Sequence, residues 1–210
     1  MIKPLQHNRF DCCNRLFRFL QYMKKIIDDI RKVYPISPAT AEELVGHLEP
    51  CMFPRRSPLI SMNVFNRAAY FIKEGITRSY WIKGGEEITT SFSTSGIVFS
   101  MDEFYYGRLS EEYVEALTDV KAVRIPLTDL EHLFRTNIEL ANWGRIIHQN
   151  EYRRIHRSHM ERLALPAAER YEAFRKQFPE ICNNVNLQYI ASYLGITAPT
   201  LSRLRSRKQQ

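Results

Sequence analysis

The 210-residue sequence predicts an α+β fold, with a unit of short strands between helices and a helical C-terminal part. Apolar residues recur at three- and four-residue spacing from Met23 to Val33, as in an amphipathic helix. Between residues 50 and 126, short runs rich in Ile, Val, Phe, Tyr and Thr are separated by Gly and Pro, which is typical of a β-sandwich or roll. The helical period returns after Pro126. Strands followed by helices exclude alternating βαβ units.

The composition is that of an ordinary globular chain, with 44% hydrophobic and 25% charged residues. No apolar run is long enough to cross a bilayer. Arg9, Arg15 and Arg18 interrupt the apolar residues of the first 22 positions, so no secretory signal is predicted there. We therefore expect a cytoplasmic protein without a membrane partner.

The cysteines give no sign of a metal centre. None of the four stands in a C-x-x-C pair, and two are adjacent, which suits neither zinc nor an iron–sulfur cluster. They are Cys12, Cys13, Cys51 and Cys182. We expect reduced thiols and no cofactor.

Charge is distributed unevenly along the chain. The net charge is +7, yet residues 34–136 hold 10 basic and 14 acidic side chains. Residues 137–210 hold 12 basic and 6 acidic ones. A basic C-terminal part predicts a polyanionic partner; on charge alone, an unspecialised basic surface remains the alternative.

Local signals place the first helices and a hairpin. Tyr34-Pro35 ends the helix that starts at Met23, and Ser37 is a candidate N-cap before Pro38. The runs 76–82 and 88–92 flank Gly84-Gly85, which predicts a β-hairpin.

Further helices are predicted after the strands, and they set the boundaries of the predicted units. We predict a short helix over 127–134, a long helix from Ile138 to about Leu163 and a further helix between Pro166 and Pro179. The predicted units are an N-terminal extension, a β-roll with flanking helices, a connecting helix and a C-terminal unit. Their ranges are 1–22, 23–136, 137–163 and 164–210.

Residues 187–205 predict a helix-turn-helix. Gly195 stands at the turn, where a positive φ is usually needed, and Thr197 is placed to cap the second helix. Pro199 falls in the first turn of that helix, and Leu201 and Leu204 face inward. From residue 198 onward there are four basic residues and no acidic one. The second helix is therefore suited to a DNA major groove.

With both halves considered, the chain resembles the Crp/Fnr family of transcriptional regulators, and especially the branch common in Bacteroidetes. The resemblance runs from about Met23 to Lys208. It rests on Tyr70-Phe71-Ile72-x-x-Gly75-x-x-Arg78-x-Tyr80 with the Gly84-Gly85-Glu86 turn, and on residues 190–197 with Thr200-Leu201-Ser202-Arg203. It implies a double-stranded β-roll like a cyclic-nucleotide-binding jelly roll, a long dimerisation helix and a C-terminal winged helix-turn-helix. Such proteins bind near-palindromic double-stranded DNA as homodimers and contact RNA polymerase.

The resemblance also implies which residues touch DNA. Arg203 would read a guanine, Thr200 and Ser202 would contact phosphate or a thymine methyl group, and basic residues further along would contact the backbone. The full candidate set is Thr197, Pro199, Thr200, Ser202, Arg203, Arg205, Arg207 and Lys208.

The nucleotide pocket of the family is altered here. Counting back from Ile125-Pro126, the family's Arg-Ser pair falls at Ser110-Glu111 and its Gly-Glu pair near Met101-Asp102. A carboxylate in place of a cation repels a phosphate, which argues against cyclic AMP. The effector is then an unidentified small molecule, or there is none.

Two other classes of function compete with DNA binding. A cupin-type enzyme site needs several histidines on neighbouring strands, and none lies between His47 and His132, so we predict no enzyme and no metal site. For His156-x-x-His159, solvent-facing or dimer-interface roles are favoured over a metal pair. The alternative function is a small-ligand sensor that works through protein contacts without binding DNA; the acid-free basic end argues against it.

Overall fold

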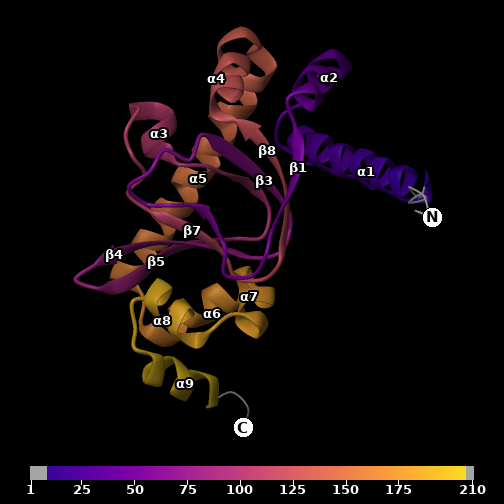
Figure 1. Cartoon of the computed structure of the whole chain (residues 1–210). Coiled ribbons are helices and arrows are strands. Elements are labelled where there is room, and N and C mark those ends of the chain that lie inside the picture. Colours follow the sequence, from indigo (N-terminus) through magenta and orange to yellow (C-terminus); the bar gives the residue numbers. More distant parts are fainter. Residues whose placement is uncertain (1–8, 207–210) are drawn as a thin grey trace, which may run out of the picture.

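The computed structural model describes residues 9–206, with side chains from residue 21 onward. One long helix joins two units along the chain (Figure 1). The first unit is a β-roll with helices against one side, and the second is a group of short helices below the roll (Figure 1). This is the predicted α+β class.

The roll consists of two four-stranded antiparallel sheets. The first has the order β1 (Glu49–Phe53), β8 (Val120–Pro126), β3 (Ala68–Glu74) and β6 (Gly96–Val98). The second has the order β2 (Pro58–Ile60), β7 (Tyr113–Ala116), β4 (Thr77–Lys83) and β5 (Glu86–Ser93). Most neighbours in these sheets are distant in sequence, so long-range pairing builds the roll.

The β4–β5 hairpin has the predicted turn. Lys83 pairs with Glu86, and Gly84 and Gly85 both have positive φ (62° and 83°), as a tight two-residue hairpin turn requires. Gly75, which precedes β4, has a different constraint. Its φ is 104°, and a Cβ at this position would lie 2.5 Å from a carbonyl oxygen of the loop before β8.

Four helices accompany the roll: α1 (Arg9–Val33), α2 (Pro38–Gly46), α3 (Met101–Tyr106) and α4 (Leu127–Thr136). α2 begins as predicted, because the Ser37 hydroxyl accepts a hydrogen bond from the Thr40 N–H (3.2 Å). α1 begins upstream of Met23, inside the predicted extension. Polar residues interrupt the apolar spacing there, which is why the periodicity located the helix only from Met23.

Two apolar clusters stabilise the roll. One packs α1, α2, α4 and the start of α5 (Ile138–Ala164) against the first sheet, and it includes Leu133 and Trp143. The other lies between the two sheets and includes Ile60 and Val114. α5 therefore begins as part of the core of the roll, over the range that the sequence predicted.

The C-terminal unit comprises α6 (Ala167–Gln177), α7 (Pro179–Asn184), α8 (Leu187–Leu194) and α9 (Ala198–Ser206). Residues 167–206 contain helices only, so the strands of the expected wing are not formed in this part of the chain; Pro179 instead starts a short helix. A third apolar cluster joins this unit to the roll through Ile76 and Phe92. No helix in the part of the chain that the structure describes is long and apolar enough to cross a membrane.

Candidate nucleic-acid interface

α8 and α9 form the predicted helix-turn-helix. Gly195 ends α8 with a left-handed φ of 65°, and its N–H donates to the Ala191 and Ser192 carbonyl groups. The Thr197 hydroxyl accepts from the Thr200 N–H (3.3 Å) and so caps α9. The turn and the cap expected from the sequence are therefore both present.

Packing leaves one face of α9 exposed. Leu201 is completely buried, together with Ile190 and Leu194 of α8. Ser202 and Arg203 are exposed on the opposite face. α9 is also the lowest element of the molecule, on the side of the helical unit away from the roll (Figure 1). Leu201 thus anchors α9 in the core of the helical unit, and the opposite face of α9 is accessible to solvent.

The candidate DNA-contacting residues differ in their surroundings. The Arg203 side chain has no hydrogen bond or ion pair with any described residue. Thr197 and Pro199 are exposed, and the Thr197 and Thr200 hydroxyl oxygens lie 2.9 Å apart. Thr197, Pro199 and Thr200 therefore lie together at the start of α9, and Arg203 follows about one turn later.

Arg205 behaves differently from Arg203. Its Nη1 donates to the Cys182 carbonyl oxygen (3.3 Å), so this guanidinium ties α9 to the end of α7. The sequence indicated only that Arg205 lies on the outer face of α9, because the position of α7 is not encoded locally. Arg207 and Lys208 lie outside the described residues, and their role stays a prediction.

The two predicted pocket pairs contact each other through Asp102 and Glu111. Met101 and Asp102 begin α3, and an Asp102 carboxylate oxygen accepts from the Glu111 N–H (3.1 Å). Ser110 is buried, and its hydroxyl donates to the Glu112 carbonyl oxygen (3.0 Å). The two pairs are therefore adjacent in space, and their role as a ligand pocket stays a prediction.

Carboxylates are the main charged groups around these two pairs. Burial, reinforced by the nearby charge of Asp102, raises the pKa of Glu112 to about 7. The raised pKa of the Glu112 carboxyl group means that a negative charge is unfavourable at this place. A phosphate placed here would meet the same loss of hydration and the charge of Asp102, and Ser110 and Glu111 offer no guanidinium to offset them.

α5 carries an exposed apolar stripe. Ile138, Tyr152, Ile155 and Leu163 are exposed by 74%, 70%, 54% and 71%. At 100° per residue these four fall within a sector of about 100°, and Met160, exposed by 48%, widens the sector to about 140°. A groove of about 610 Å³ beside this stripe is lined by side chains of α3, α4 and α5, among them Tyr105 and Tyr152.

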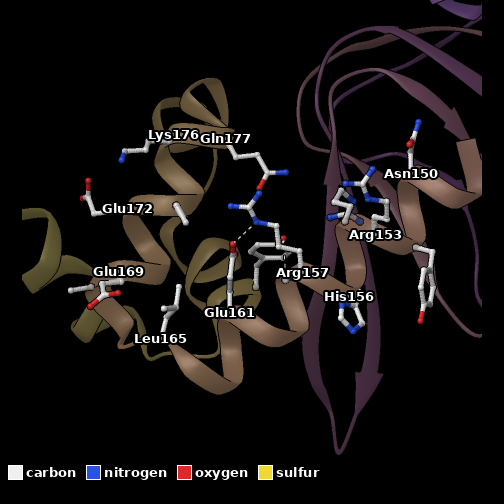
Figure 2. A pocket seen from close by; sticks show the side chains of 16 residues that line it. Asn150, Arg153, His156, Arg157, Glu161, Leu165, Glu169, Glu172, Lys176 and Gln177 are labelled. Carbon is white, nitrogen blue, oxygen red and sulfur yellow. Dashed lines mark hydrogen bonds and ion pairs between the residues drawn. The ribbon is translucent and has the colours of Figure 1, made fainter. Parts of the chain in front are cut away.

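A second hollow lies where α5 meets α6. This cleft has a volume of about 1210 Å³, and its walls are the last turns of α5 and the outer face of α6 (Figure 2). Arg153 and Lys176 line it together with Glu169, while Arg157 is paired with Glu161 (2.9 Å). Both signs of charge line the cleft, so it favours no single charge class of ligand. No cluster of three or more His, Cys, Asp or Glu residues suited to a metal occurs among the residues that the structure describes.

Comparison with known proteins gives a consistent set of folds. No family model and no curated protein matches the sequence. Among solved structures, the chain is similar to CLP, the c-di-GMP responsive global regulator of Xanthomonas campestris, at 16% identity and a TM-score of 0.63, covering 82% of this chain and 92% of that one. It is similar to FixK2 of Bradyrhizobium japonicum at 20% identity and 0.62, covering 76% and 83%.

A third structure extends the agreement. A transcriptional regulator assigned to the Crp/Fnr family from Eubacterium rectale matches at 16% identity and a TM-score of 0.67, with 83% of this chain and 84% of that one covered. The three matches cover between 76% and 83% of this chain. The Bacteroidetes-type branch stays a prediction. The chain has the fold of the Crp/Fnr transcriptional regulators.

Proposed function

We propose that this protein is a sequence-specific DNA-binding transcriptional regulator of the Crp/Fnr type. The observation that carries the proposal is α9, an exposed and acid-free basic helix held by a buried Leu201 at the outer end of the molecule. A helix of this kind enters the major groove, where Arg203 is free to make a bidentate contact with guanine. Contact with RNA polymerase is part of the same proposal and follows from the family resemblance.

The proposed reader is a homodimer on near-palindromic sites. The exposed stripe of α5 supports this, because large apolar side chains gathered on one helix face are typical of a protein–protein interface, and a second α5 would cover them. Two-fold symmetry would then place two α9 helices about 34 Å apart, one turn of DNA.

As part of the same proposal, the pocket formed by the two residue pairs does not bind cyclic AMP. The carboxylates of Asp102 and Glu112, and the lack of a cation at Ser110 and Glu111, support this part. An unidentified small molecule, or control by abundance alone, replaces it.

The test is selection from a randomised duplex-DNA pool with full-length protein at near-physiological salt and without added ligand. An enriched palindrome with half-site centres about 10 base pairs apart is expected. The matched control is Arg203→Ala, which leaves the buried face of α9 unchanged. A second selection with cyclic AMP tests the pocket, and we expect the same palindrome at the same enrichment. Failure to enrich any sequence in either selection would favour the alternative, a sensor that acts through protein contacts.

A further inference from the structure

The roll and the helix-turn-helix meet through the β4–β5 hairpin. Ser192 of α8 accepts a hydrogen bond from the Thr89 N–H of β5 (3.0 Å), and its hydroxyl donates to the Glu87 carbonyl oxygen (3.2 Å). One serine of the DNA-reading unit thus continues the hydrogen bonding of a sheet in the other unit. Figure 1 shows α8 directly below this hairpin.

A buried arginine lies at the same joint. Arg78 of β4 is only 1% exposed, and its guanidinium carbon lies 4.0 Å from the centre of the Tyr80 ring and 3.6 Å from that of Tyr189. Tyr80 belongs to the hairpin and Tyr189 to α8. The guanidinium is therefore sandwiched between one aromatic ring from each unit.

Two carboxylates neutralise this arginine. Arg78 forms ion pairs with Glu87 of β5 and with Glu115 of β7, the latter over 2.9 Å between Nε and Oε1. Its Nη1 has no hydrogen-bond partner among residues 21–206. The ion pairs of Arg78 must first offset the free-energy cost of removing its charge from water. They therefore contribute little net stability to the contact between the two units.

The adhesion between the units comes from apolar contact. Ile76 and Phe92 of the roll pack against Phe174 and Tyr193 of the helical unit. The aromatic pairs of this cluster have preferred geometries, but each adds only about 0.5–1.5 kcal/mol beyond the area that it buries. A planar guanidinium between two rings and a serine hydrogen-bonded at both ends add further directional constraints on α8.

We propose that Arg78, with Ser192, is a positioning residue for DNA binding: it fixes the orientation of α8, and with it α9, on the roll. This inference rests on the proposed function and deepens it, because a residue of the sensor roll then sets how the DNA-reading helix is presented. The two recognition helices of a dimer must match two half-sites at once, so a freely rotating α8 would bind one half-site as before and two half-sites less well.

The decisive variant is Tyr189→Leu, with Tyr189→Phe as its matched control. Leucine removes the aromatic face from Arg78 while keeping an apolar residue of high helix propensity, and phenylalanine keeps the ring. Ser192→Ala is the second variant, because it removes the two hydrogen bonds without disturbing the apolar cluster. Each is made in the full chain, and circular dichroism verifies its helix content.

The first measurement is independent of DNA. Hydrogen–deuterium exchange of residues 86–90 should rise about threefold in Tyr189→Leu and in Ser192→Ala, with α9 unchanged and Tyr189→Phe like the wild type. Unchanged exchange at residues 86–90 in both variants would overturn the positioning role, whatever the DNA result.

The second measurement compares full-site and half-site DNA. Tyr189→Leu should lower full-site affinity about tenfold and leave half-site affinity within about twofold. An equal loss on both DNAs would overturn the proposal, because α8 itself would then be damaged. If exchange rises but the wild type prefers no DNA sequence, the joint stands and the proposed function fails.

Discussion

Truncating Arg203 to alanine should lower the discrimination between DNA sequences without changing the stability of the fold. The side chain is exposed on α9 and has no partner among the described residues, so its removal should change the free energy of unfolding by no more than about 0.5 kcal/mol. A bidentate contact with guanine contributes about 1–3 kcal/mol of discrimination. Arg203→Ala should therefore lower the ratio of specific to non-specific affinity about 5- to 150-fold at 25 °C.

Arg205→Ala is the informative control. This arginine donates to the Cys182 carbonyl oxygen (3.3 Å), so truncation should cost about 1 kcal/mol of stability. Any contact that it makes with DNA goes to phosphate, which would lower affinity for all sequences alike and reduce the salt slope by about one.

Fluorescence anisotropy with the selected operator and a scrambled duplex, each at several salt concentrations, measures both effects. Urea unfolding of the free proteins supplies the stability part. The assignment is refuted if Arg203→Ala keeps the wild-type affinity ratio, or if Arg205→Ala lowers that ratio instead.

Three further predictions concern stability, pH and assembly. Gly75→Ala should lower the free energy of unfolding by more than about 3 kcal/mol, because the new Cβ would lie 2.5 Å from a main-chain oxygen. Gly84→Ala, which has open space around it, should lower it by about 1 kcal/mol. Similar urea midpoints for the two variants would contradict this prediction. The raised pKa of Glu112 means that the folded protein binds more protons than the unfolded chain between about pH 4.5 and 7, so stability falls as pH rises through that window. Glu112→Gln should remove about 2 kcal/mol of this fall, measured by urea unfolding at pH 5 and pH 8, and parallel pH profiles would count against it. Ile155→Glu should shift sedimentation from dimer to monomer, while Met52→Glu on β1, where the side chain is even more exposed (69% against 54%), should not; an unchanged dimer in Ile155→Glu would exclude the α5 stripe as the interface.

Local signals explain how much of the fold was predictable. The turn at Gly195, the caps at Ser37 and Thr197 and the hairpin at Gly84-Gly85 depend on neighbours within a few residues, and all four are present. The helix upstream of Met23 was missed because polar residues break its apolar spacing. The short helix α3 was also missed, since six residues are too few to show a period.

Long-range contacts explain what could not be predicted. Arg78 and Tyr189 come together across more than a hundred residues, and no spacing in the sequence links them. Arg205 turns toward α7 for the same reason. The pocket pairs were assigned by counting along a resembling family, whereas the burial that raises the pKa of Glu112 depends on how the roll closes.

The unbroken course of α5 acts as a lever. Its 27 residues span about 40 Å. The first turns are fixed in the roll by Leu140 and Trp143, while at the other end the Ser158 hydroxyl lies 3.4 Å from the Tyr193 hydroxyl of α8. A tilt of about 5° at the roll would move the far end by about 3.5 Å, close to the rise of one base pair. Under the proposed function, repacking of a few side chains around Trp143 would shift α8 and α9 by that distance only if the contacts of Tyr189 and Ser192 with the β4–β5 hairpin yield.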